Sequence, residues 1–138
     1  MVMMGPGLRA RFTETMLTTA SPSRLLTMLY DRLHRDLTEA GEALGRGDWA
    51  GAHRPLVHAQ DIVIELRTAL DPTVWPAANE MRQLYTYLLD TLCSANAGKD
   101  VGRVTTCLRI VEPLRDAWHQ AERVAGDGAA PGISALAR

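Results

Sequence analysis

The sequence contains only two cysteines, Cys93 and Cys107. Two cysteines are too few for the disulfide framework of a small secreted domain, and their spacing does not match a zinc motif. We expect two reduced, half-buried thiols, although antiparallel helices joined at Gly98 would allow them to touch. A scaffold held together by disulfides or structural zinc is therefore excluded.

A long apolar run and an excess of one charge are also missing. No stretch approaches the roughly 20 apolar residues that span a bilayer, and the N-terminal MVMMGPGLRARF lacks the apolar core of a secretory signal. The 15 basic and 16 acidic residues are scattered and give a net charge of -1. Because no basic stripe is present, binding to nucleic acid is not expected. We expect a cytoplasmic protein that does not insert into membranes.

Strict alternation of apolar and polar residues, the pattern of a half-buried strand, is absent as well. Instead, apolar residues recur at helical spacing over four segments. These segments are 21–44, 48–71, 77–97 and 101–125. We predict an all-α fold, an antiparallel up-down four-helix bundle over residues 21–125. A short mobile N-terminal arm, 1–20, precedes it, and a disordered, glycine-rich C-terminal tail, 126–138, follows it.

The ends of these helices carry recognisable signals. Asp48 and Asp100 are expected to be N-caps of the second and fourth helices, and Gly98 is expected to end the third. Pro55 predicts a kink in the second helix or a start delayed to residue 54. Pro113 predicts a bend in the fourth helix.

A metal site is the chemistry that these helices come nearest to offering. Asp31 and His34 are three residues apart, as are His58 and Asp61, so each pair would lie on one helical face. Metal-binding bundles usually combine Glu-x-x-His with glutamates on facing helices, and the third and fourth segments offer none. A metal-binding bundle is therefore kept only as an alternative.

Other catalytic arrangements are not visible. His53 and His119 stand alone near helix ends and are expected at the surface. The sequence shows no Ser-His-Asp or Cys-His arrangement and no glycine-rich phosphate loop. We therefore expect a protein that is not an enzyme and needs no cofactor.

The apolar residues cover more of each helix than one packing seam requires. Leu25, Leu29 and Leu33 form one stripe, which we assign to the core, whereas Leu26 and Tyr30 lie about a hundred degrees further round the helix. The second and third helices also carry wide apolar arcs. Packing against two neighbours explains part of this excess. The rest indicates grooves for an amphipathic segment of another chain, or a homodimer interface.

Five pieces of the sequence resemble, in order and spacing, the flagellar secretion chaperones, the flagellin-specific export chaperones of bacteria. The resemblance covers residues 12–118. It implies an antiparallel four-helix bundle without a cofactor, which binds the disordered C-terminal region of flagellin and prevents polymerisation before export. The pieces are TASPSRLLTMLYDRL (19–33), HAQDIVIELRTALD (58–71), LYTYL (84–88), AN (95–96) followed by Asp100, and LRDAW (114–118).

The resemblance also bears on single positions. Phe12 stands where the family usually has a tyrosine that folds over the flagellin-binding groove, so Phe12 is the expected lid. Arg32 replaces a usual glycine. Asp31 and Asp61 are motif positions in relatives that hold no metal, which weakens the metal alternative. We predict that flagellin is held in apolar grooves between helices, lined by Leu26, Tyr30, Ile62, Leu66, Leu84, Tyr87 and Leu88.

Components of the flagellar export gate are expected to be further partners, and the free chain is expected to be a monomer or a weak homodimer. The alternative from a different class is a self-associating structural bundle, in which the extra apolar stripe forms a homodimer interface.

Overall fold

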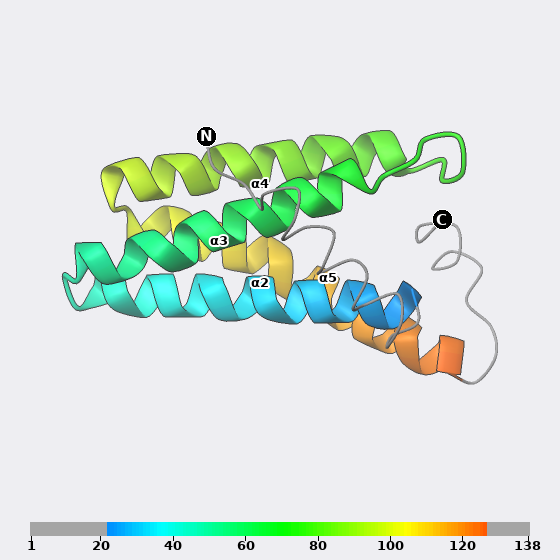
Figure 1. Cartoon of the computed structure of the whole chain (residues 1–138), viewed down its shortest axis with the longest axis horizontal. Helices are drawn as coiled ribbons and strands as arrows, with labels where there is room; N and C mark the ends of the chain where they lie inside the picture. Colours follow the sequence, from blue (N-terminus) through cyan, green and yellow to red (C-terminus); the bar gives the residue numbers. More distant parts are fainter. Residues whose placement is uncertain (1–21, 127–138) are drawn as a thin grey trace, which may run out of the picture.

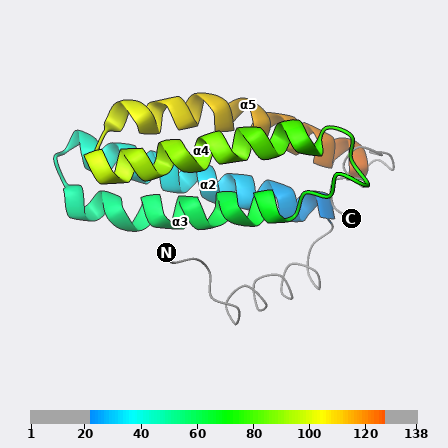
Figure 2. The same cartoon turned by 90° about the horizontal axis from the view of Figure 1, so that it is seen from above.

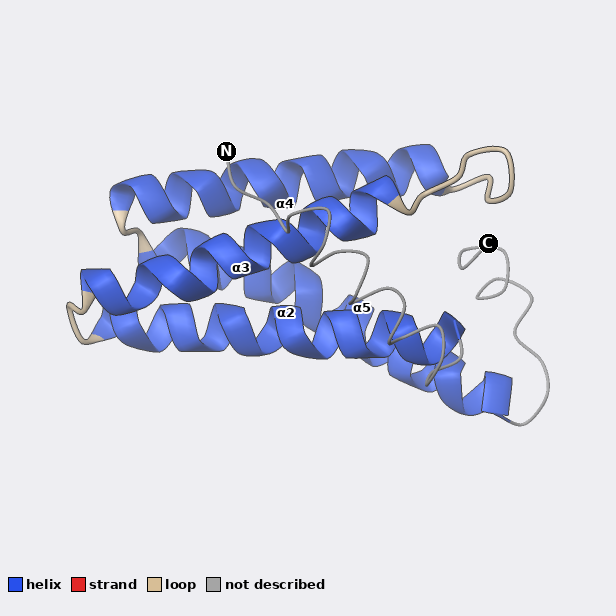
Figure 3. Ribbon diagram, viewed as in Figure 1, coloured by secondary structure: helices blue, strands red, loops and turns tan. Residues whose placement is uncertain are grey.

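Four helices run back and forth along one long axis (Figure 1). They are α2 (Pro22–Gly45), α3 (Trp49–Thr68), α4 (Ala78–Gly98) and α5 (Val101–Gly126). The computed structural model describes residues 22–126, and within them only helices and their connecting turns are present (Figure 3). The predicted all-α four-helix bundle is therefore confirmed. The predictions for the arm, Phe12 included, and for the tail after Gly126 lie outside the described residues.

The helices form a four-cornered ring. Each helix packs against the next one in the chain, and α5 closes the ring by packing along α2, while the diagonal pairs make no close backbone contact. Figure 2 shows the same arrangement from above, with α2 and α3 side by side and α4 and α5 side by side. Since every helix has two neighbours, each can bury a wide apolar arc.

The start of α3 partly follows the sequence prediction. Asp48 is the N-cap, and its carboxylate accepts a hydrogen bond of 2.9 Å from the backbone N–H of Gly51. The predicted delay of the start to residue 54 is wrong, because α3 begins at Trp49 and continues through a buried Pro55. A proline within a helix removes one backbone donor and crowds the carbonyl group four residues earlier, here that of Gly51, yet α3 is continuous through this position. The kink stays a prediction, as does the bend at Pro113.

The turn between α4 and α5 differs from the prediction by one residue. Gly98 is still helical, and Lys99 takes the left-handed conformation, with φ of 49°. The ammonium group of Lys99 donates to the side-chain oxygen of Asn96 at 2.7 Å, which fixes the long side chain over the helix end. Asp100 caps α5 as predicted, because its carboxylate accepts the N–H of Gly102 at 2.9 Å.

The core answers the question of the two apolar stripes on α2. Leu26 and Tyr30 are buried, as are Leu29 and Leu33, whereas Leu25 is only partly buried at the rim. The assignment of Leu25 to the core is therefore only partly correct. The second stripe packs inward because α2 lies between α3 and α5, and a helix with two neighbours buries both stripes.

Candidate partner-binding surface

The structure divides the predicted lining residues into two groups. Leu84 is partly buried and Tyr87 is 52% exposed. The other described residues of the set have exposures of 8% or less and belong to the hydrophobic core. They are Leu26, Tyr30, Ile62, Leu66 and Leu88. Of the described residues in the predicted set, Leu84 and Tyr87 are therefore the two that offer apolar surface to a partner.

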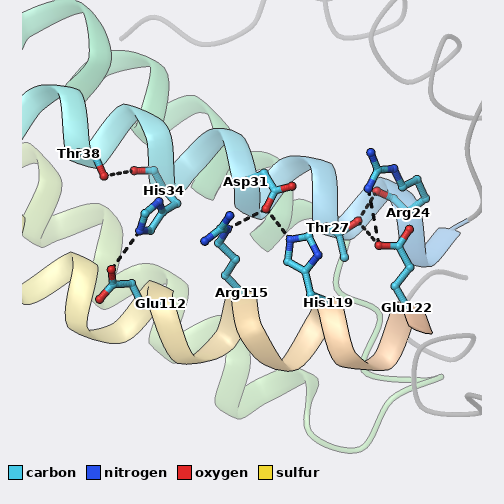
Figure 4. A network of polar contacts seen from close by, with 9 residues as sticks. All are labelled: Arg24, Thr27, Asp31, His34, Thr38, Glu112, Arg115, His119 and Glu122. Carbon is cyan, nitrogen blue, oxygen red and sulfur yellow. Dashed lines mark hydrogen bonds and ion pairs between the residues drawn. The ribbon is translucent and has the colours of Figure 1, made fainter. Parts of the chain in front are cut away.

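Polar side chains close the seam between α2 and α5 (Figure 4). One carboxylate oxygen of Asp31 accepts hydrogen bonds from the guanidinium of Arg115 at 2.7 Å and the imidazole of His119 at 2.6 Å. Burial alone would raise the pKa of Asp31, but the hydrogen bonds and charges of His119 and Arg115 together hold it below its ordinary value. His119 therefore takes part in an interhelical hydrogen bond, although the sequence suggested an isolated surface histidine.

The same seam is bridged at two further levels (Figure 4). His34 Nε2 and Glu112 Oε2 lie 3.0 Å apart. Towards the start of α2, the buried hydroxyl of Thr27 donates to the carboxylate of Glu122 at 2.9 Å. Three successive polar bridges therefore join α2 to α5.

The seams on either side of α3 are bridged in a similar way. Between α2 and α3, the imidazole of His58 contacts the buried carboxylate of Asp36. Between α3 and α4, the side-chain amide of Asn96 donates to His53 Nδ1 at 3.1 Å. A longer bond of 3.5 Å, from the Cys93 thiol to Gln60, follows the same seam.

These contacts also account for the side chains that suggested a metal site. Asp31, His34 and His58 each have a partner on a neighbouring helix, so the two predicted pairs do not converge. No group of three or more His, Cys, Asp or Glu side chains that could hold a metal ion occurs among residues 22–126. The two cysteines are free, with Cys93 exposed and Cys107 buried, and burial raises the pKa of Cys107 to about 12.

The seam between α4 and α5 has a different character. Within the described part of the chain, no side-chain hydrogen bond or ion pair joins these two helices, and they pack less extensively than any other neighbouring pair. Leu84 and Tyr87 are one turn apart on α4, on the flank opposite the residues that contact α3, such as Cys93 and Asn96. This flank of α4 therefore faces the α5 side.

The matching flank of α5 is apolar too. Glu112, Arg115 and His119 mark the side of α5 that contacts α2. Ile110 and Leu114, one turn apart, lie on the other flank, and both are partly buried. We call the surface formed by Leu84, Tyr87, Ile110 and Leu114 the α4–α5 seam.

The sequence-based prediction missed the contribution of α5 to this surface. A signal was available, because Ile110 and Val111 are adjacent apolar residues that cannot share one face of a helix. The structure buries Val111 and leaves Ile110 partly accessible. On α2, by contrast, apolar residues also occupy two faces of the helix, but both faces pack inward.

Four helices with one apolar seam free of polar bridges define an antiparallel α-helical bundle with an apolar surface of the kind that amphipathic segments bind. None of the helices within residues 22–126 is long and apolar enough to cross a membrane. The family model described as "Flagellar protein FliS" matches residues 7–125, and the chain belongs to this family.

Three relatives share the name "Flagellar secretion chaperone FliS". The Bacillus subtilis protein is 30% identical, over 80% of this chain and 82% of the relative. The Salmonella typhimurium protein is 28% identical, over 78% and 81%. The Vibrio cholerae protein is 26% identical, over 78% and 79%. These findings confirm the predicted family, which is a family of chaperones and not of enzymes.

Proposed function

We propose that this chain is a cytoplasmic export chaperone for flagellin. It binds the disordered C-terminal region of flagellin and prevents polymerisation before secretion through the flagellar export apparatus. Membership of the FliS family and the names of the relatives support a role in flagellar secretion. We choose the α4–α5 seam as the binding surface because, among the described residues, it lacks the polar bridges of the other three seams.

The chemistry of the seam suits an amphipathic segment that orders as it binds. Leu84, Ile110 and Leu114 supply apolar surface, and Tyr87 supplies a half-exposed ring with a hydroxyl that can stay at the wet rim. Covering such surface contributes roughly 25 cal/mol per Å². A helix with apolar anchors three and four residues apart would match this arrangement.

The buried members of the predicted lining have a different role in this proposal. Leu88 lies one turn beyond Leu84 and would form the floor beneath the seam. Leu26, Tyr30, Ile62 and Leu66 would touch a partner only if the core opened. We propose that these four support the bundle and that Leu84 and Tyr87 make the contacts.

The test is a calorimetric titration of the full chain with a peptide of the flagellin C-terminal region. We expect binding at tens of micromolar or tighter, weakened at least tenfold by Tyr87→Glu and Ile110→Glu with helicity retained in circular dichroism. Trp49→Glu is the matched control, because Trp49 is also 52% exposed but lies at the start of α3. Absence of binding by the natural chain would overturn the proposed function. Equal effects of all three substitutions would overturn the assignment to the seam.

Sedimentation separates this proposal from a self-associating structural bundle. We expect a free monomer, or a weak homodimer that dissociates on dilution, and a one-to-one complex once flagellin is added. A dimer that is stable at low concentration and does not dissociate with flagellin would favour the structural bundle. We further propose that components of the export gate receive the complex, which predicts co-purification with them only when flagellin is present.

A further inference from the structure

A stripe of apolar residues continues from the α4–α5 seam to the end of α5. Its members recur every four and three residues, so they share one face of the helix. At the seam they are Ile110 and Leu114, and further along they are Ala117, Ala121 and Val124. We call these five residues the α5 stripe. Ala117 is exposed, and Val124 is 47% exposed although its side chain is large and apolar.

The α5 stripe leads to the point where the described part of the chain ends. α5 ends at Gly126, two residues after Val124, and residues 127–138 follow. Because α4 and α5 run antiparallel, this end of α5 lies where α4 begins (Figure 2). The seam and the α5 stripe therefore form one apolar track that ends beside the first residues of the tail. α2, which follows the N-terminal arm, packs against α3 and α5 and is not part of this track.

The tail, residues 127–138, carries the sequence pattern that suits the seam. Its sequence is DGAAPGISALAR. Ile133 and Leu136 are three residues apart, which is the spacing of two anchors on one face of a helix, and alanine, a strong helix former, occupies positions 135 and 137. Gly126 and Gly128 stand at the start of the segment, and glycine most readily adopts the backbone angles of a chain reversal.

The length of this segment matches the distance that it has to cover. Residues 127–133 span at most about 23 Å when fully extended. Leu114 lies about 18 Å back along α5 from Gly126, at a rise of roughly 1.5 Å per residue. After a reversal at the glycines, Ile133 can thus reach the level of Leu114, and Leu136 can reach the level of Ile110.

We propose that residues 127–138 fold back along α5 and cover the α4–α5 seam of the free chain, with Ile133 and Leu136 as anchors. This inference rests on the proposed function, since it makes the tail a competitor of flagellin for one surface. Two anchors remove only a small apolar area from water, so the tail covers the seam in part of the molecules and flagellin displaces it. The apparent affinity for flagellin then falls in proportion to the fraction of uncovered chains.

Disulfide trapping tests the contact of the tail without flagellin. In a full chain carrying Cys93→Ser, Ser134→Cys is combined either with Ala117→Cys, on the α5 stripe, or with Asp116→Cys, its matched control. Both positions on α5 are exposed and equally far from the tail along the chain to within one residue, but their side chains point about 100° apart. Because docking raises the effective concentration of the two thiols, we expect the pair with Ala117→Cys to form an intramolecular disulfide about tenfold faster.

Three outcomes of the trapping would overturn the proposal. One is an equal rate for the two pairs. Another is a disulfide that joins two copies, which would make a second copy the occupant of the seam. The third is faster trapping of Ala117→Cys by Phe12→Cys than by Ser134→Cys, which would assign the seam to the N-terminal arm.

Titration with the flagellin C-terminal peptide tests the competition. Ile133→Glu with Leu136→Glu removes both anchors, whereas Ala129→Glu with Ala130→Glu adds the same charge to the tail and is the matched control. We expect the first double variant to bind the peptide about two- to fivefold more tightly than the natural chain, and the control to bind as the natural chain does. Equal or weaker binding by the first variant would show that the tail does not compete with flagellin.

The two assays separate a failure of this inference from a failure of the proposed function. If the natural chain does not bind flagellin but the pair with Ala117→Cys is trapped faster than the pair with Asp116→Cys, the proposed function is wrong and the tail contact stands. If flagellin binds and the two pairs are trapped at equal rates, the proposed function stands and the tail contact is wrong.

Discussion

The hydroxyl oxygens of Tyr30 on α2 and Tyr85 on α4 lie 2.6 Å apart at the centre of the bundle. Both side chains are buried, and they link two helices whose backbones do not pack against each other. Burial raises the pKa of both phenols, so each stays protonated and the two share a neutral hydrogen bond. The ring of Trp118 lies beside Tyr30, with 6.3 Å between the ring centroids.

This pair predicts non-additive effects of substitution. Tyr30→Phe or Tyr85→Phe alone leaves one buried hydroxyl without its partner and should lower the free energy of unfolding by about 1–3 kcal/mol. The double substitution removes both hydroxyls and should cost less than the sum of the two single substitutions. Urea unfolding of the four proteins measures the difference. Strict additivity would show that the hydrogen bond does not couple the two helices.

Ile62 and Tyr87 should behave in opposite ways, although both were predicted to line a groove. Ile62 is 2% exposed, and Ile62→Ala should lower the free energy of unfolding by about 2–5 kcal/mol because it leaves a cavity. Tyr87 is 52% exposed, and Tyr87→Ala should change the stability by less than about 1 kcal/mol while weakening flagellin binding. Chemical unfolding and calorimetry on the same samples check both statements. A large loss of stability in Tyr87→Ala would place its ring in the core.

Asp31 predicts a loss of stability in acid. Its pKa is lower in the folded chain than in the unfolded chain, so the unfolded chain takes up the proton first as the pH falls. The stabilisation from Asp31 is therefore complete above the ordinary carboxyl pKa of about 3.9 and is lost as the pH falls through the folded-state value. Urea unfolding measured from about pH 2 to about pH 7, a range that includes the ordinary carboxyl pKa, measures this dependence. Asp31→Asn should reduce it, whereas Asp116→Asn, at an exposed site on α5, should not. An unchanged profile in Asp31→Asn would contradict the prediction.

The turn at residues 98 and 99 offers two stabilising substitutions. Gly98 is helical, and a Cβ atom there would meet nothing within 4 Å, so Gly98→Ala should raise the free energy of unfolding by up to about 1 kcal/mol. Lys99 has a φ of 49°, which glycine adopts more readily, so Lys99→Gly should also stabilise, by less than about 1 kcal/mol because the bond to Asn96 is lost. Thermal unfolding checks both, and Gly47→Ala, at a φ of 75°, should destabilise in the same assay.

The sequence predicted the parts of the fold that depend on neighbours along the chain. Apolar spacing determined that four helices form, and Asp48 and Asp100 marked two of their starts, because a cap acts on N–H groups two or three residues away. Gly98 was a weaker guide, since left-handed residues at helix ends are usually, but not always, glycine. The five pieces of sequence, taken together in their order and spacing, predicted the family, which the match to residues 7–125 confirms.

Only the tertiary structure decided which apolar stripes face inward and which seam stays without polar bridges. Leu26 and Tyr30 are as apolar as the residues of the α4–α5 seam, and they are buried because α2 packs between two neighbours. The partners of Asp31, Arg115 and His119, lie more than 80 residues away in the sequence, so no local pattern predicts these contacts. Periodicity determines which residues share a helical face, whereas the neighbour that covers this face is set by how the four helices pack together.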